Sequence, residues 1–268
     1  MTNHCLHAIG FALFWRQNAE QAERKISNKQ GDFMAKINFI ITVVLMLLIV
    51  ASTSFAADRY QWKLDSVENN CQIYTSTVPG KEYIASKTTC VIPARMEVVG
   101  IILKHIEKYP EWMDDCKETK ILKVVDDQND VVIFWFRQHI ALFPDRDMVL
   151  KSKVEMNLKN CKDIIYADLT DEMKYEAGKG YVRMPSFSSV WTLEWKDREH
   201  TVVTFMADPD IGKGVPTGIA NHLIKTAGYK SLKRMMKEVK KSEYIEEAKI
   251  SKYHKFVEEA INAGYVKP

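Results

Sequence analysis

The side chains best suited to acid–base chemistry are scattered along this chain. Five of the seven histidines, at positions 105, 139, 200, 222 and 254, lie after residue 57 and fall in different predicted elements. The sequence contains no Gly-x-Ser-x-Gly, His-Glu-x-x-His, P-loop or Gly-x-Gly-x-x-Gly motif, which would mark a common catalytic, metal or phosphate site. We therefore interpret the histidines as surface or structural residues. No catalytic residue, metal ligand or cofactor is predicted.

Four cysteines after residue 57 could form disulfides. Cys71 and Cys90 flank two strand-like runs that meet at Pro79-Gly80, and a hairpin centred there would place the two cysteines opposite each other. A Cys71–Cys90 disulfide is therefore predicted, and Cys116–Cys161 follows by elimination. The sequence has no Cys-x-x-Cys, which argues against a zinc ribbon or a thioredoxin-like site.

An export signal is predicted near the start of the chain. Lys36 is followed by an almost wholly apolar run over 37–50 and by small residues at Ser54 and Ala56. This is the pattern of a secretory signal peptide cleaved after Ala56, although an uncleaved N-terminal anchor fits the same residues. We expect an upstream extension over 1–33, a signal peptide over 34–56, a folded domain over 57–241 and a helical tail over 242–268. The protein is then exported, to the periplasm.

The composition is that of an ordinary globular protein, with 46% hydrophobic and 27% charged residues. The net charge of +3 falls close to zero when residues 1–56 are left out. Such a balance gives no indication of nucleic-acid binding, which is typical of strongly basic domains. A basic run from Lys230 to Lys241 is interpreted as a solvated helix face. Transient contact with an anionic membrane surface is the alternative.

The predicted elements are two strands, a helix, a series of strands and a long helix. The first helix follows Pro93, and the later strands cover 121–125, 131–140, 148–158, 164–169, 189–195 and 201–207. Between Met148 and Leu158 apolar and polar residues alternate, so one face of the sheet is wet and the other is covered. A curved antiparallel sheet wrapped around the last helix, an α+β arrangement, is the architecture that this order favours.

The last long helix is predicted to begin at Pro216, after a loop rich in Asp, Gly and Pro. One face carries Ile219, Ala220, Leu223, Ile224 and Ala227, and a second face begins after Gly228. Either the helix bends at Gly228 within an ordinary core, or its small-residue first half roofs a cavity.

Several motifs in a fixed order resemble one family. They are Trp112 after the first helix, Phe143-Pro-Asp-Arg-Asp-Met-Val149 at a strand entry, Gly180-Tyr-Val-Arg-Met-Pro185, and Ala207-Asp-Pro-Asp210 before Pro216 and Asn221. Together with the order of elements they are similar to START lipid-transfer domains of the helix-grip superfamily, in particular to small exported bacterial members. The resemblance covers about residues 60–241. It implies a cavity between the curved sheet and the C-terminal helix.

The resemblance also implies the function. We expect a monomer that binds, and in an extended role transfers, a lipid or other hydrophobic small molecule without a cofactor. The residues expected to line the cavity are Trp135, Arg137, Leu150, Val154, Arg183, Trp191, Ile219, Leu223 and Ala227.

Arg137 shares a strand face with Trp135, so it must reach the sheet edge, an acidic partner or an anionic head group. Arg146 and Asp147 are expected to pair and so to fix the entry of their strand. Two alternatives stay open for the function. One is a polyketide cyclase or aromatase-like enzyme on the same fold, with His139 or Asp168 as acid or base. The other is an accessory protein whose aromatic residues fill the interior.

Overall fold

The structure is a computed structural model that describes residues 59–176 and 180–267. The expected upstream extension and signal peptide lie outside these residues. From Tyr60 onward the chain forms one compact unit. Within the described residues, no helix combines the length and the apolar character needed to cross a membrane.

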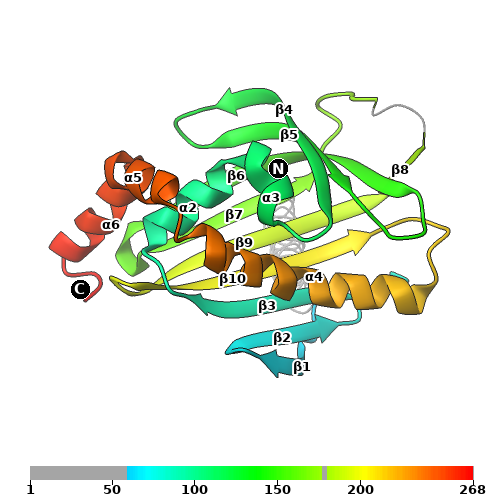
Figure 1. Cartoon of the computed structure of the whole chain (residues 1–268), viewed down its shortest axis with the longest axis horizontal. Coiled ribbons are helices and arrows are strands. Elements are labelled where there is room, and N and C mark those ends of the chain that lie inside the picture. The colour runs from blue at the N-terminus through cyan, green and yellow to red at the C-terminus, as the bar shows by residue number, and fades with distance from the viewer. Residues whose placement is uncertain (1–58, 177–179, 268) are drawn as a thin grey trace, which may run out of the picture. The chain divides into compact units, whose positions relative to one another are not determined.

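One antiparallel sheet dominates this unit (Figure 1). Its order is β1-β2-β3-β10-β9-β7-β6-β5-β4, and the short β8 runs parallel to β6. The strands are β1 Lys63–Glu68, β2 Cys71–Ser76, β3 Ala85–Ile92, β4 Cys116–Asp126, β5 Val131–Gln138, β6 Asp145–Asn157, β7 Lys162–Leu169, β8 Tyr181–Arg183, β9 Ser186–Asp197 and β10 His200–Asp210. The predicted strands are confirmed, and β1 and β8 are additional.

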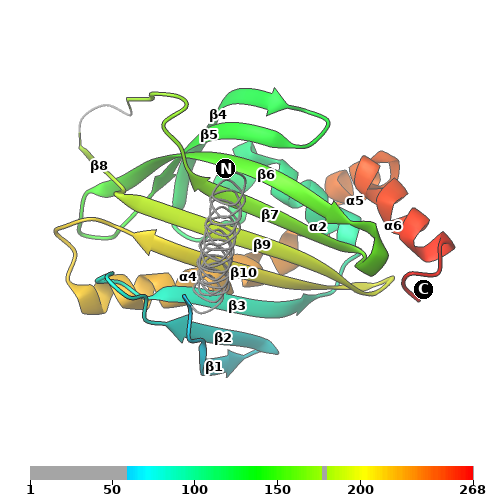
Figure 2. The same ribbon diagram turned by 180° about the vertical axis from the view of Figure 1, so that it is seen from behind.

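The helices of the described residues lie on one face of the sheet, and Figure 2 shows the sheet from its other side. The longest, α4, covers Thr217–Glu238 and contacts β2, β3 and β10. The others are α2 Met96–Lys104, α3 Tyr109–Trp112, α5 Ser242–Ile250 and α6 Lys252–Asn262, with short 3₁₀ turns at Ile106–Lys108 and Leu158–Asn160. The predicted tail is therefore two helices, and both contact α2.

Gly228 allows α4 to lie close to the sheet. A Cβ atom at this position would be 2.7 Å from the Thr88 hydroxyl oxygen and 3.3 Å from the Phe205 ring. Contacts this short are not tolerated between ordinary side chains, so only glycine fits between α4, β3 and β10. The position that the sequence marks as a change of helix face is thus a point where α4 lies very close to the sheet.

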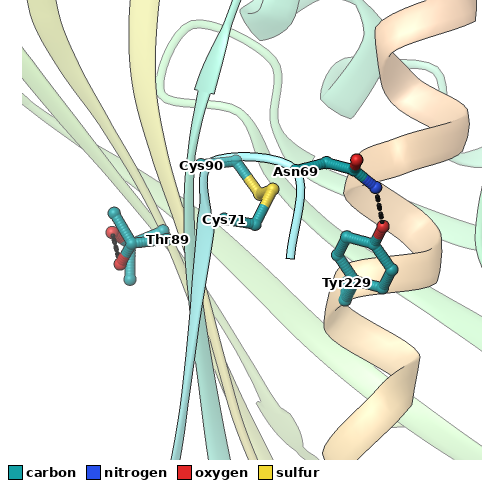
Figure 3. The surroundings of a disulfide bond; sticks show 6 residues. Asn69, Cys71, Thr89, Cys90 and Tyr229 are labelled. Atoms are coloured by element: carbon teal, nitrogen blue, oxygen red, sulfur yellow. Dashed lines mark hydrogen bonds between the residues drawn. A yellow bond between two sulfur atoms is a disulfide. The ribbon is translucent and has the colours of Figure 1, made fainter. Parts of the chain in front are cut away.

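The disulfide Cys71–Cys90 is present and joins β2 to β3 (Figure 3). Gln72 pairs with Thr89 in the register of these strands, so the two cysteines lie directly opposite each other, as predicted from the hairpin. In the adjacent β1–β2 turn, Asn69 donates a side-chain hydrogen bond to the Tyr229 hydroxyl of α4. The covalent link therefore lies next to the contact that ties the first hairpin to α4.

The second predicted disulfide is wrong, because Cys116 and Cys161 are free thiols. Cys116 pairs with Gln138, which pairs with Arg146 at one end of β6, whereas Cys161 follows the other end of that strand. Eleven residues of strand correspond to about 35 Å, far beyond the reach of a disulfide. Burial raises the pKa of each thiol to about 12, so both are poor nucleophiles.

Replacing both Cys71 and Cys90 by Ser is expected to lower the free energy of unfolding by about 3 kcal/mol, because the unfolded chain gains the entropy of a loop of this length. Urea unfolding with and without dithiothreitol measures the effect. The reductant should destabilise the wild-type protein and leave the double variant unchanged. An equal response of both proteins would contradict the prediction.

Candidate functional site

A cavity of about 350 Å³ lies between the concave face of the sheet and α4. It is lined by β5, β6, β7, β9 and β10 on one side and by α2, α4 and the segment around Tyr109 on the other. The first half of α4 contributes Ala220, Leu223, Ile224 and Ala227. Two arrangements were considered for this helix, and the structure shows the one in which the small residues of its first half roof a cavity.

The register of the strands explains which side chains reach this cavity. On β5 and β6 the pairs are Val132 with Ser152, Phe134 with Leu150 and Phe136 with Met148, and all six side chains line it. Because side chains alternate between the two faces of a strand, the intervening residues must point to the convex face. On β9, Trp191 lines the cavity and stacks on Phe205 of β10 with ring centroids 4.2 Å apart.

The loop before α4 is fixed by a buried arginine. Arg146 donates from Nε to the Ile211 carbonyl at 2.8 Å and from Nη2 to the Lys213 carbonyl at 3.0 Å. The side chain is 1% exposed, and these hydrogen bonds compensate for burying its charge. Arg146 therefore holds the start of α4 in place over the cavity. The predicted pair with Asp147 is wrong, because adjacent residues of β6 point to opposite faces of the sheet.

Five of the nine residues predicted to line the cavity do so: Leu150, Val154, Trp191, Leu223 and Ala227. Whether they touch a ligand stays a prediction. The other four lie elsewhere, and for them the predicted location is wrong.

Trp135, Arg137 and Arg183 lie on the convex face. Trp135 is buried there beside Ile133 and Val149, and its indole nitrogen donates to Asp147 at 2.9 Å. Arg183 pairs with the same carboxylate at 2.8 Å.

Arg137 forms an ion pair with Asp145 at 2.7 Å. Of the three alternatives considered for Arg137, the acidic partner is therefore the one found. Ile219, in the first turn of α4, is 46% exposed and turns away from the cavity.

The comparisons with known proteins agree with this geometry. The family model for the START domain matches residues 50–244, which is most of the chain. The chain belongs to the START-domain family. An uncharacterised protein of Pseudomonas aeruginosa is 25% identical over 195 residues, which are 72% of this chain and 92% of that protein.

Solved START structures share the fold. A STAR-related lipid transfer protein from Xanthomonas axonopodis superimposes with a TM-score of 0.60 at 20% identity, covering 67% of this chain and 99% of the other. Human StAR-related lipid transfer protein 5 gives a TM-score of 0.60 at 14% identity, over 74% and 97% of the two chains. The predicted family and the predicted helix-grip fold are both confirmed.

The two residues on which the enzyme alternative depends are not part of the cavity wall of this START domain. His139 is bonded to Asp145 at 2.8 Å. Asp168 is exposed on β7, opposite Lys151 on the convex side. Among the described residues, no cluster of three or more His, Cys, Asp or Glu could hold a metal ion. The geometry therefore provides a place for binding and places neither suspect where a ligand would lie.

Asp163 is among the polar side chains of the START cavity that the sequence reasoning missed. Asp163 on β7 is 3% exposed and lines the cavity, and its Oδ1 atom is buried without a hydrogen-bond partner among the described residues. Burial, aided by the nearby Asp130 carboxylate, raises its pKa to about 7. Strand alternation with Ile165 and Ala167, which also line the cavity, could have revealed it.

Proposed function

We propose that this protein binds a lipid or another hydrophobic small molecule in the cavity beneath α4. The observation that carries the proposal is an apolar cavity of about 350 Å³ in a START fold, since small-molecule sites have volumes of about 300–1,000 Å³. Removal of apolar ligand surface from water would drive binding, at about 25 cal/mol per Å² before ordering costs.

The ligand would contact the five cavity residues predicted from the sequence, Leu150, Val154, Trp191, Leu223 and Ala227. Trp191 is 4% exposed and presents a large apolar surface, which is the kind of side chain that dominates contacts with apolar ligands. Flat or extended hydrocarbon groups fit a wall of this composition, and the site has no need of a metal or redox cofactor.

We propose that the protein is exported and that it transfers the bound ligand. The Cys71–Cys90 disulfide supports an oxidising compartment such as the periplasm. On α4, Lys230 and Arg234 are paired with Asp114, whereas Lys233 and Lys237 on the same helix and Lys240 just after it are exposed. These exposed lysines support brief contact with an anionic membrane surface during transfer, with the protein acting as a monomer.

Native mass spectrometry of the protein, purified from an oxidising compartment, tests the proposal. We expect a stoichiometric adduct that dissociates on activation and that solvent extraction identifies as a lipid or other apolar molecule. Protein that carries no adduct, and that takes up none from a total lipid extract of its host, would contradict the proposed function.

A further inference from the structure

One end of the cavity is built from three elements that are distant in sequence. Asp163 comes from β7, Asp130 from the turn between β4 and β5, and Tyr253 from α6, and all three line the cavity. We call this group the acidic end. Since the family match stops at residue 244, α6 lies beyond it, so a part of this wall belongs to the C-terminal tail of this chain.

Tyr253 is held firmly in this position. The residue is 4% exposed, and its ring packs over Gly100 of α2, where a Cβ atom would be 3.5 Å from the ring. Its hydroxyl donates to Asp130 Oδ2 at 2.8 Å, and Lys252 lies 2.6 Å from the same oxygen. Asp130 is therefore already satisfied by α6, and Tyr253 ties α6 to the β4–β5 turn.

The Asp163 Oδ1 atom has no hydrogen-bond partner in the part of the chain that the structure describes. Its neighbours in the sheet are Leu193 on β9 and Met156 on β6, which offer no hydrogen-bond donor from their side chains. A buried polar atom without a hydrogen-bond partner costs about 1–3 kcal/mol. A donor group on a molecule inside the cavity would remove this cost.

The charge at this end restricts that donor. Asp130 and Asp163 are both acidic, and Lys252 is paired with Asp130 and not with Asp163. Above about pH 7, where the Asp163 carboxyl group is ionised, a phosphate or a carboxylate would be repelled here, whereas a hydroxyl or an ammonium group could donate to the unpartnered Asp163 Oδ1 atom. The lining between this end and α4 is mostly apolar and suits a hydrocarbon chain.

We propose that the acidic end receives the hydroxyl or ammonium group of an amphiphilic ligand, whose apolar chain extends along the cavity toward α4. This inference rests on the proposed function and adds to it the polarity and orientation of the ligand. Asp163 accepts the hydrogen bond, and the tail helix α6 closes the wall behind it.

Isothermal titration calorimetry at about pH 8, where Asp163 is ionised, tests the inference with three probes that share one hydrocarbon chain. The probes are dodecanol, dodecylamine and dodecanoate, each below its micellar concentration. The wild-type protein should bind the better of dodecanol and dodecylamine at least about tenfold more tightly than dodecanoate. The ranking of dodecanol against dodecylamine then tells whether the site prefers a hydroxyl or an ammonium group.

Two matched variants locate the effect. Asp163→Asn should reduce the preference over dodecanoate by about tenfold, whereas Asp168→Asn, the same change on the opposite face of β7, should leave it unchanged. Dodecanoate binding as tightly as both other probes, or an unchanged preference in Asp163→Asn, would overturn the inference and leave the proposed function standing. If the wild-type protein bound none of the three, this inference would be overturned, and the native mass spectrometry experiment would decide the proposed function separately. The order of the three affinities in the wild-type protein tests the inference even if a variant does not fold.

Discussion

The variant Ala227→Phe is expected to fold and to bind the natural ligand about a hundredfold more weakly than the wild-type protein. Ala227 lies on the cavity-facing side of α4, so the new ring would occupy space that the ligand needs. A ligand that gives up about 100 Å² of apolar contact loses about 2.5 kcal/mol, close to a hundredfold in Kd. The amount of ligand retained through purification and the Kd for re-added ligand both measure the effect.

His222→Phe is the matched control, because His222 is exposed on the same helix and does not line the cavity. It adds the same ring to α4 outside the cavity and should bind like the wild-type protein. Thermal unfolding followed by circular dichroism checks that both variants are folded. Unchanged affinity in a folded Ala227→Phe protein would show that the ligand does not occupy the cavity.

The stability of the wild-type protein is expected to fall as the pH rises from about 4 to about 7, through the titration of Asp163. Its pKa is about 7 in the folded protein and 3.8 ordinarily, because burial disfavours the charged carboxylate. Between these values the folded state holds a proton that the unfolded state has released. The free energy of unfolding therefore decreases with rising pH, by up to about 4 kcal/mol, and levels off above pH 7.

Asp163→Asn removes this titration while keeping the shape of the side chain. Asp130, Lys252 and Tyr253 face the same region and remain in both proteins, so their contributions largely cancel in the difference. Urea unfolding at about pH 5 and about pH 8 should show that the free energy of unfolding of the variant, relative to that of the wild-type protein, is larger at the higher pH. Asp168→Asn, exposed on the other face, should follow the wild-type curve. Parallel pH profiles for the wild type and Asp163→Asn would refute the assignment.

The sequence determined the local features of this protein. Alternation from Met148 to Met156 predicted the faces of β6, and Met148, Leu150, Ser152 and Val154 do line the cavity. The small residues of α4 made a helix that roofs a cavity one of two alternatives, and the hairpin around Pro79-Gly80 predicted the disulfide. Each of these depends on residues that are close along the chain or in one hairpin, where geometry follows from the periodicity of helix and strand.

Face assignment failed where both faces of a strand are covered. On β5 the cavity residues include Phe134 and Phe136, while Trp135 between them is packed against Tyr175 on the other side. A strand that is apolar on both faces gives no polar residue by which to tell them apart, and an error of one position exchanges the faces. Arg137 was placed in the cavity with Trp135 for this reason.

Only the tertiary structure decided which distant groups meet. Pairing Cys116 with Cys161 by elimination could not take account of their location at opposite ends of β6. Nothing local brings Tyr253 of the tail to Asp130 of a turn more than a hundred residues earlier. That contact requires α6 to pack on α2 and α2 to lie across the sheet, so the acidic end of the cavity exists only when the whole chain has folded.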